Sequence, residues 1–147
     1  MTKVNALVCN SISENLSGIS LDSISLPNLN SNDVLVKVKA ASVNFPDLLM
    51  SQGKYQHKPN LPFVLGMEGS GIIEDKGKNV NNFKQGDEVM FGSWDNGAFA
   101  EQVILPESGI KKKPLSLSFA QAASFQTAYL TAYVSFIRRG KLKKGEK

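Results

Sequence analysis

A series of short apolar segments separated by glycine-containing turns is the feature that most limits the fold of this chain, and it extends up to about residue 113. In residues 33–40, Val34, Val36 and Val38 alternate with other residues and share one face of a predicted strand. Further short strands are predicted over residues 71–74, 87–91 and 99–105.

Glycine is concentrated in the same part of the chain. Eight of the twelve glycines fall between Gly66 and Gly109. The turns and sharp bends of a closed or nearly closed barrel need glycine, because it adopts backbone conformations that other residues avoid. The sequence therefore predicts a mainly β fold with helices, built around a small barrel.

A short helix is predicted inside this pattern. Asn44 can cap it, and Pro46 suits its first helical position. Asp47 places a negative charge near the positive end of the helix dipole, and Gly53 can end the helix.

A longer helix is predicted from about Ser118 to Arg139. Ser118 and Gln121 have the spacing of a capping box, and Gly140 is a suitable stop. The helix is apolar on two sides. One stripe consists of Phe119, Ala122, Ala123, Leu130, Tyr133, Val134 and Ile137, and the other of Phe125, Ala128, Ala132 and Phe136.

A helix that is apolar on two sides needs two partners. The barrel can cover one side, and we expect a second domain, absent from this sequence, to cover the other. The chain is therefore divided into a barrel domain, residues 1–117, and an interdomain helix with a basic tail, residues 118–147.

The net charge of +4 comes from the C-terminal end of the chain. Residues 138–147 contain six basic residues and one acid, so the remainder is close to neutral. The other basic run, Lys111–Lys113, has no interleaved aromatic residue, and we interpret it as solvated lysines. This distribution does not fit a nucleic-acid groove.

Length and composition favour a single cytoplasmic domain. The 147 residues suffice for one core, and no apolar run reaches the roughly 18 residues that span a bilayer. The N-terminus lacks the apolar region of a signal peptide. Cys9 is the single cysteine, which rules out an internal disulfide and agrees with a reducing compartment.

The densest motifs form an ordered block of five segments. They are residues 43–49 (VNFPDLL), 52–55 (QGKY), 58–71 (KPNLPFVLGMEGSG), 83–89 (FKQGDEV) and 97–101 (GAFAE). In this order and spacing they resemble the GroES-like, alcohol dehydrogenase-like N-terminal domain of the medium-chain dehydrogenase/reductase superfamily. Within it they are most similar to the NADPH:quinone oxidoreductase group, which includes the zeta-crystallin-like and VAT-1-like proteins.

This resemblance implies a GroES-like β-barrel followed by a helix that leads into a Rossmann domain. The chain ends at Lys147 and contains no G-x-G-x-x-G sequence, because Gly66, Gly69 and Gly71 have the wrong spacing and no predicted helix after them. We interpret these three glycines as tight turns into a strand. NADPH is then expected to bind mainly to the absent domain.

The activity implied by the resemblance is hydride transfer from NADPH to a quinone or to a conjugated enone or enal. The 147-residue fragment is expected to be inactive alone, and the full-length protein to form a homodimer. Two alternatives remain open at this point: a non-catalytic VAT-1-like binding or interaction module, and an enoyl-thioester reductase with a tyrosine as proton donor.

The resemblance also implies that no zinc is used. Asn44 stands where zinc-dependent relatives have a cysteine ligand, and Met67 stands where they have a histidine. A neutral amide is a poor zinc ligand, and a thioether prefers softer ions. His57, the single histidine, is expected on the surface of a loop.

Three candidate catalytic residues follow from the resemblance. Asn44 would lie near the nicotinamide and the substrate, and its alternative role is that of a helix cap. Asp47 would line the same cleft, although the helix dipole explains it equally well. Tyr55 would stack on a flat acceptor and bond its oxygen, unless it is a half-buried core residue.

The remaining candidates are contacts. Met67, which we expect mainly to pack, and Trp94, on a loop that could rim the cleft, are the predicted substrate contacts alongside Tyr55. Glu68 is expected to brace the barrel by hydrogen bonds. The family motif Thr-Ala-Tyr, whose threonine contacts the cofactor, occurs at residues 127–129 and 131–133. Counting from both sides matches the second copy, so Thr131 is the predicted cofactor contact.

Overall fold

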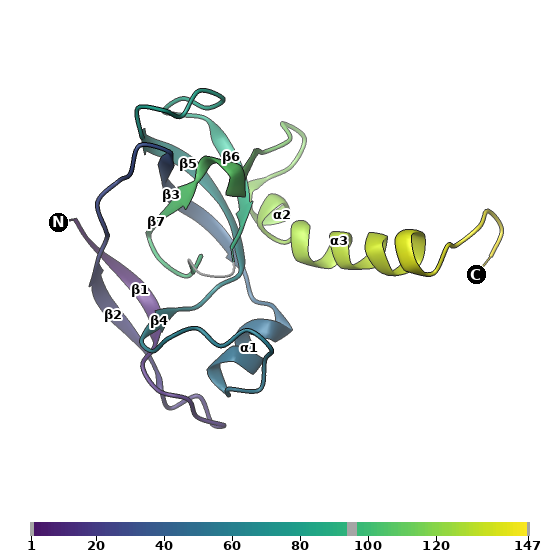
Figure 1. The fold of residues 1–147 in the computed structure, drawn as a ribbon, viewed down its shortest axis with the longest axis horizontal. Coiled ribbons are helices and arrows are strands. Elements are labelled where there is room, and N and C mark those ends of the chain that lie inside the picture. Colours follow the sequence, from purple (N-terminus) through teal and green to yellow (C-terminus); the bar gives the residue numbers. More distant parts are fainter. Residues whose placement is uncertain (1, 94–96, 147) are drawn as a thin grey trace.

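A computed structural model describes residues 2–93 and 97–146. Within these residues, eight strands form two sheets, and a helical segment extends away from them (Figure 1). The three-stranded sheet has the order β2 (Ile19–Ser25), β1 (Lys3–Cys9), β4 (Phe63–Val64). The five-stranded sheet has the order β7 (Gln102–Pro106), β3 (Asp33–Ser42), β5 (Glu68–Lys76), β6 (Glu88–Gly92), β8 (Ile110–Lys112). A short 3-10 helix, η1 (Glu107–Gly109), connects β7 to β8.

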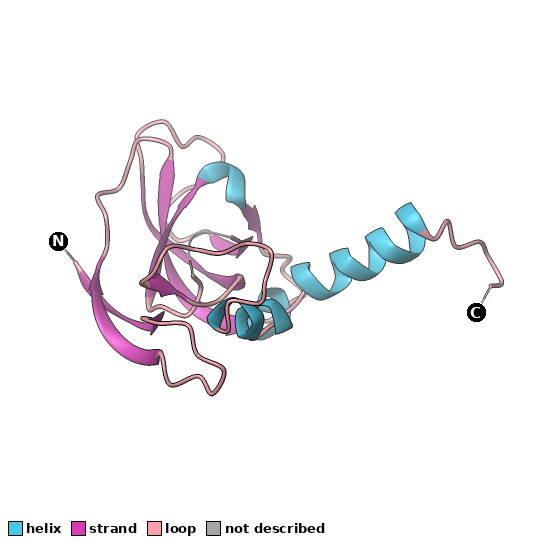
Figure 2. Ribbon diagram, turned by 60° about the horizontal axis from the view of Figure 1, so that its bottom comes forward, coloured by secondary structure: helices cyan, strands magenta, loops and turns pink. Residues whose placement is uncertain are grey.

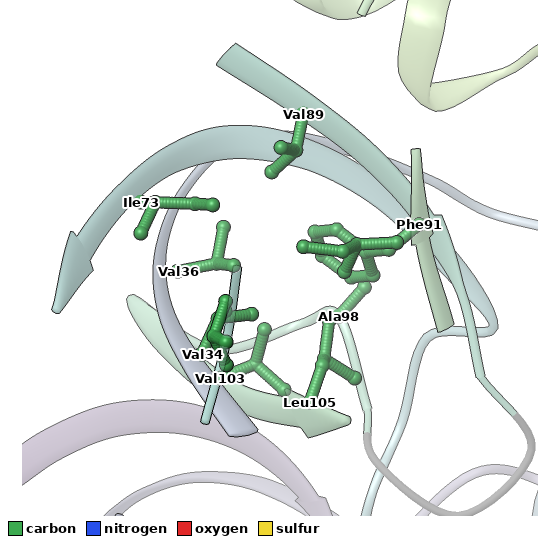
Figure 3. Close-up of a cluster of buried hydrophobic side chains, with 10 residues drawn as sticks. Val34, Val36, Ile73, Val89, Phe91, Ala98, Val103 and Leu105 are labelled. Carbon is green, nitrogen blue, oxygen red and sulfur yellow. The ribbon is translucent and has the colours of Figure 1, made fainter. Parts of the chain in front are cut away.

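The five-stranded sheet is antiparallel throughout and carries the main core. Val36 of β3 pairs with Ile73 of β5 and with Val103 of β7, so three branched side chains meet on the inner face. Figure 3 shows the resulting apolar cluster. Its members are Val34, Val36, Ile73, Val80, Val89, Phe91, Ala98, Val103, Leu105 and Ile110.

The two sheets are joined through the segment that enters β7. The Leu7 N–H donates to the Phe99 carbonyl (2.8 Å), and the Glu101 N–H donates to the Asn5 carbonyl (3.0 Å). On its other side this segment accepts a hydrogen bond from the Val38 N–H at the Glu101 carbonyl (3.0 Å). These bonds close the sheets into a barrel, so the expected mainly β barrel is confirmed.

The strands predicted at 33–40, 71–74, 87–91 and 99–105 correspond to β3, β5, β6 and β7. The strands β1, β2, β4 and β8 were missing from the sequence prediction. In β1 the alternation was present, since Val4, Ala6 and Val8 are buried, but their partner strand β2 is rich in serine.

The glycines near the start of β5 have two different functions. Gly66 has φ +102° and makes the turn before the strand, as expected. Gly71 lies within β5, where an added Cβ would approach the Lys37 carbonyl oxygen to 2.1 Å. Gly69 also lies in β5, so the interpretation of all three as turns was wrong for these two.

The short helix α1 (Phe45–Ser51) forms where it was predicted, with Asn44 at its N-cap. The Asn44 N–H donates to Asp47 Oδ2 (2.8 Å). Gly53, with φ +68°, follows the end of the helix.

The predicted long helix is divided. Its parts are α2 (Phe119–Ala123), α3 (Gln126–Tyr133) and a π-helical end, η2 (Val134–Arg139). The start is as expected, because Ser118 and Gln121 make both bonds of the capping box. The prediction of one continuous helix was wrong: the Ser124 hydroxyl bonds to the carbonyls of Ala120 and Gln121, and the Thr127 N–H donates to Glu68 Oε2.

Only the first of these segments has residues buried against the barrel, and α3 touches it through its first turn alone. Ala122 and Ala123 of α2 are 1% and 2% exposed, whereas α3 and η2 have no buried residue. Both views show α3 extending away from the barrel (Figures 1 and 2). The barrel therefore covers only the beginning of one apolar stripe, and most of both stripes is exposed beyond Phe125. No helix among the described residues has the length and apolarity needed to cross a membrane.

The interpretation of residues 111–113 as solvated lysines was wrong for Lys113. Its side chain is 5% exposed and forms an ion pair with Glu88 (3.0 Å). Lys113 Nζ also donates to the Leu117 carbonyl (2.6 Å) and lies 5.3 Å from the centre of the Phe119 ring. The buried amine thus fixes the connection between β8 and α2.

Candidate active site

A cleft of about 340 Å³ lies between the barrel and α3. It joins the beginning of α1, the loop after α1, the end of β6 and the first two turns of α3. Its lining residues are Pro46, Tyr55, Met67, Gly92, Ser93, Gln126, Thr127, Leu130 and Thr131. Three of the predicted site residues, Tyr55, Met67 and Thr131, are therefore brought together from segments far apart in the sequence.

The two predicted contacts from the barrel side differ in exposure. Tyr55 is half-buried and lies on the loop that follows α1. Met67 is 8% exposed and lies immediately before β5. A wall that combines a thioether, a phenol ring and Pro46 suits a flat apolar molecule.

Thr127 and Thr131 both line the cleft, because residues four apart share one face of a helix. Thr131 is exposed, and Thr127 is partly buried with its backbone N–H bound to Glu68. The choice of Thr131 over Thr127 as the cofactor contact stays a prediction.

Asn44 is half-buried at the N-cap of α1 and is not among the residues that line the cleft. Its side-chain Nδ2 donates to Ser42 Oγ (2.9 Å) and to Glu68 Oε1 (3.1 Å). The amide group is therefore directed toward the end of β3 and the beginning of β5.

Glu68 is the centre of this network. It is 1% exposed, and its Oε1 also accepts a hydrogen bond from Ser42 Oγ (2.6 Å). Its Oε2 accepts from the Thr127 N–H (2.9 Å). The carboxylate thus connects β3, the N-cap of α1 and the first turn of α3, which agrees with the expected bracing role and extends it to the helix.

Asp47 is buried, with 4% of its surface exposed. Its Oδ2 accepts from the Asn44 N–H and its Oδ1 accepts from the Gly66 N–H (3.2 Å). Burial raises the pKa of this carboxyl above its ordinary value, an effect that the backbone N–H groups partly oppose. Asp47 therefore ties α1 to the turn before β5 and is absent from the cleft lining; a catalytic role for it stays a prediction.

Trp94, a predicted substrate contact, lies outside the described residues.

Gln126 lines the cleft and was missed in the sequence prediction, because nothing in the sequence separates this glutamine from an exposed helical residue. Its Nε2 is buried and has no hydrogen-bond partner among residues 2–93 and 97–146.

No group of three histidine, cysteine, aspartate or glutamate side chains that could hold a metal occurs in the described parts of the chain. Cys9 is buried in β1, where its Sγ approaches the Ser11 carbonyl (3.5 Å). His57 is half-buried, rather than on the surface as expected, and lines a different cavity of about 420 Å³ beside β2 and β7. That larger cavity contains none of the predicted site residues, so the cleft beside α3 is the better candidate.

Comparison with known proteins gives a consistent result. Residues 30–115 match the model of the alcohol dehydrogenase GroES-like domain. The chain is 38% identical over 141 residues to quinone oxidoreductase-like protein 2 homolog of Nematostella vectensis, which covers 96% of this chain and 38% of that protein. It is 36% identical over 123 residues to human quinone oxidoreductase, covering 84% and 37% of the two chains.

The structural comparison extends over almost the whole chain. The crystal structure of human synaptic vesicle membrane protein VAT-1 homolog-like protein superposes with a TM-score of 0.90 at 33% identity. The superposition covers 99% of this chain and 46% of the human one. The chain therefore spans less than half of the length of the relatives that it matches.

Proposed function

The chain belongs to the alcohol dehydrogenase GroES-like domain family, and we propose that it forms the substrate side of an oxidoreductase that reduces a quinone or a conjugated enone or enal. The observation that carries this proposal is the cleft beside α3, which collects Tyr55, Met67 and Thr131. Its volume of about 340 Å³ is at the lower end of the range for small-molecule sites. The similarity to quinone oxidoreductases supports the reaction class.

We propose that NADPH binds on the α3 side of this cleft. The two threonine side chains and the buried Nε2 of Gln126, which has no partner in the part of the chain that the structure describes, support this because they are polar groups to which a nicotinamide carboxamide or a ribose would bond. When bound, NADPH would supply a hydride ion to the acceptor. We propose Thr131 and Asn44 as cofactor contacts on this chain, with the rest of the binding site in a nucleotide-binding domain.

The residues of the barrel side would bind and orient the acceptor. Tyr55 presents its ring to a flat molecule and its hydroxyl to the oxygen on which negative charge develops. Met67 packs against the same molecule and helps to exclude water. Asp47 would act by holding α1 against the turn at Gly66.

The proposed reaction requires no metal. At the positions where zinc-dependent relatives have a cysteine and a histidine, this chain has Asn44, whose amide bonds to Ser42 and Glu68, and Met67, which packs. Neither group is a usual zinc ligand. A quinone or enone needs less polarisation than a simple carbonyl, because its conjugated system spreads the developing charge.

The exposed faces of α3 and η2 support a further part of the proposal. We propose that a nucleotide-binding domain covers these faces, with residues 118–147 as the connection, and that the assembled protein is a cytoplasmic homodimer. Without that domain the barrel is expected to be inactive, since most of the cofactor site would be absent.

The test uses the longest polypeptide that the source gene encodes. Oxidation of NADPH is followed by its absorbance with a naphthoquinone, an enone and an enal, for the wild type and for Tyr55→Phe. We expect turnover with at least one acceptor, and a lower kcat in Tyr55→Phe because the hydroxyl is lost. Absence of NADPH oxidation with all three acceptors would refute the proposed reaction.

A non-catalytic binding module is the second candidate, and the close superposition on a VAT-1 homolog-like protein favours it. In that case the apolar faces of α3 and η2 would bind a protein partner. The same kinetic assay separates the two candidates, because a binding module would leave NADPH unoxidised. An enoyl thioester is added to this assay as a fourth acceptor. If it alone supports turnover and the rate depends on Tyr55, the reductase alternative with a tyrosine proton donor applies.

A further inference from the structure

The hydrogen bonds around Glu68 have a definite direction. A carboxylate can only accept, so the Thr127 N–H, the Ser42 hydroxyl and the Asn44 amide must all donate to it. Because the Ser42 hydroxyl proton is used for Glu68, Ser42 Oγ can accept from Asn44 Nδ2 (2.9 Å). The protons of these groups are thereby assigned without conflict.

This direction fixes the orientation of the Asn44 side chain. Its NH2 group is held on the inner side by Ser42 and Glu68, so Oδ1 faces the first turn of α1, where the capping box places it opposite the Asp47 N–H. An amide oxygen has two lone pairs, so Oδ1 is the end that can accept from a further partner. The inverted amide would place Oδ1 against the carboxylate oxygen, with two acceptors facing each other in a buried site. The amide NH2 donates hydrogen bonds and the amide oxygen accepts them, so this network decides that the oxygen is directed away from Glu68.

We propose that Glu68 is a positioning residue that sets the hydrogen-bond polarity of Asn44, so that Asn44 presents an acceptor and never a donor to a bound molecule. Toward a ligand, this inference rests on the proposed function. The ligand group at Asn44 is then an N–H or O–H donor, such as a primary carboxamide. The carbonyl oxygen of the acceptor is left to Tyr55, which lines the cleft where Asn44 does not.

The same carboxylate holds both sides of the site together. Oε1 binds the N-cap of α1 and Oε2 binds the first turn of α3, so the orientation of Asn44 and the position of the α3 wall depend on one side chain. Replacement by glutamine separates these two effects. Glutamine can keep the bond from the Thr127 N–H only if its own NH2 faces Ser42 and Asn44, which inverts the Asn44 amide.

The experiment is NMR on the full 147-residue chain, with the side-chain NH2 signals of asparagine assigned. In the wild type, the Asn44 NH2 protons are expected to exchange with water at least about tenfold more slowly than those of the exposed Asn28, because they are held in part-buried bonds to Ser42 and Glu68. In Glu68→Gln, we expect this protection to be lost while the Thr127 amide stays protected.

Ser70→Ala is the matched control. Ser70 is the next residue on the same face of β5, is fully buried, and also bonds to the helical segment, donating from Oγ to the Phe119 carbonyl (2.6 Å). A merely structural effect would appear in both variants. The proposal requires that Ser70→Ala leave the Asn44 NH2 signals unchanged.

Three results would overturn the proposal: rapid exchange of the Asn44 NH2 in the wild type, unchanged protection in Glu68→Gln, or the same loss in Ser70→Ala. If Glu68→Gln fails to fold, the wild-type measurement still decides, since the inward orientation predicts nuclear Overhauser contacts from the Asn44 NH2 to Ser42. None of these results depends on NADPH oxidation, so a failure here is distinguishable from a failure of the proposed function.

Discussion

Lys113 combines a buried charge with several fixed partners, and this makes it a sensitive residue for stability. Its ammonium group bonds to Glu88, to the Leu117 carbonyl and, at 3.3 Å, to the Pro114 carbonyl. Lys113→Met keeps the apolar stem but leaves these acceptors without a donor. We expect a loss of about 1–3 kcal/mol in the free energy of unfolding, measured by urea denaturation.

Glu88→Gln is the control for this prediction. Glu88 is 43% exposed, so water can replace its part of the ion pair, and a loss below about 1 kcal/mol is expected. Equal losses in the two variants would show that the ion pair, and not the pair of backbone carbonyls, holds the connection to α2.

The buried carboxyl of Asp47 is expected to give the free energy of unfolding an unusual dependence on pH. Burial raises its pKa in the folded state above the ordinary value of 3.8, so in the interval between the two the folded protein keeps a proton that the unfolded chain has lost. The folded state binds more protons there, and the free energy of unfolding therefore falls as pH rises. At a pH below both pKa values, or above both, Asp47 does not change how the free energy of unfolding depends on pH.

The measurement compares the wild type with Asp47→Asn, which cannot ionise, by urea denaturation from below pH 3.8 to neutrality. As pH rises, the stability of the wild type relative to the variant is expected to decrease in the pH interval just above 3.8 and then to level off. A relative stability that increases with pH would mean that the backbone N–H groups outweigh burial and that the pKa is lowered.

At the scale of elements, α2 is the segment through which the helical part is attached to the barrel. Ala122 is 1% exposed where α2 packs on β3, β5 and β6, whereas Ala120 on the same helix is exposed. Ala122→Leu overpacks this contact and is expected to cost about 1–3 kcal/mol of stability. Ala120→Leu adds the same group in water, and thermal unfolding should show almost no change.

The elements also show what the sequence could and could not predict. Strand β3 and helix α1 carry local signals, the alternation at Val34, Val36 and Val38 and the cap at Asn44, and both were predicted nearly to their ends. Strand β2 lacks such a signal because it is rich in serine, and its pairing with β1 supplies its order. Strand β2 was missed for that reason.

The break between α2 and α3 could not be predicted for a different reason. Its cause includes a bond from the Thr127 N–H to Glu68, a residue far away in the sequence, which overrides the local helical pattern. The candidate site, too, depends in part on contacts between residues far apart in the sequence. Tyr55, Met67 and Thr131 were predicted through a resemblance and do meet at one cleft, but the cleft itself and the contribution of Gln126 depend on the tertiary arrangement.

For the whole molecule, order is distributed unevenly along the chain. The barrel has an apolar core closed by two sheets, while α3 and η2 have no buried residue and carry exposed aromatic side chains such as Tyr133 and Phe136, at 52% and 59% exposure. A helix of this length is only marginally stable in water without packing. The isolated chain should therefore open locally in this segment long before the barrel unfolds.

Hydrogen exchange measured by NMR on the isolated chain tests this distribution. The amides of β3 and β5 are expected to exchange only through global unfolding, and those of η2 at least about a hundredfold faster, since local fraying suffices to expose them. Thr127 is the informative exception, because its N–H is bound to the buried Glu68 and should be protected like the barrel. If the amides of η2 are protected as well as those of β3, a partner already covers this surface in solution. Light scattering would then identify that partner as a second copy of the chain. In that case the proposal that a nucleotide-binding domain covers α3 and η2 would have to be abandoned.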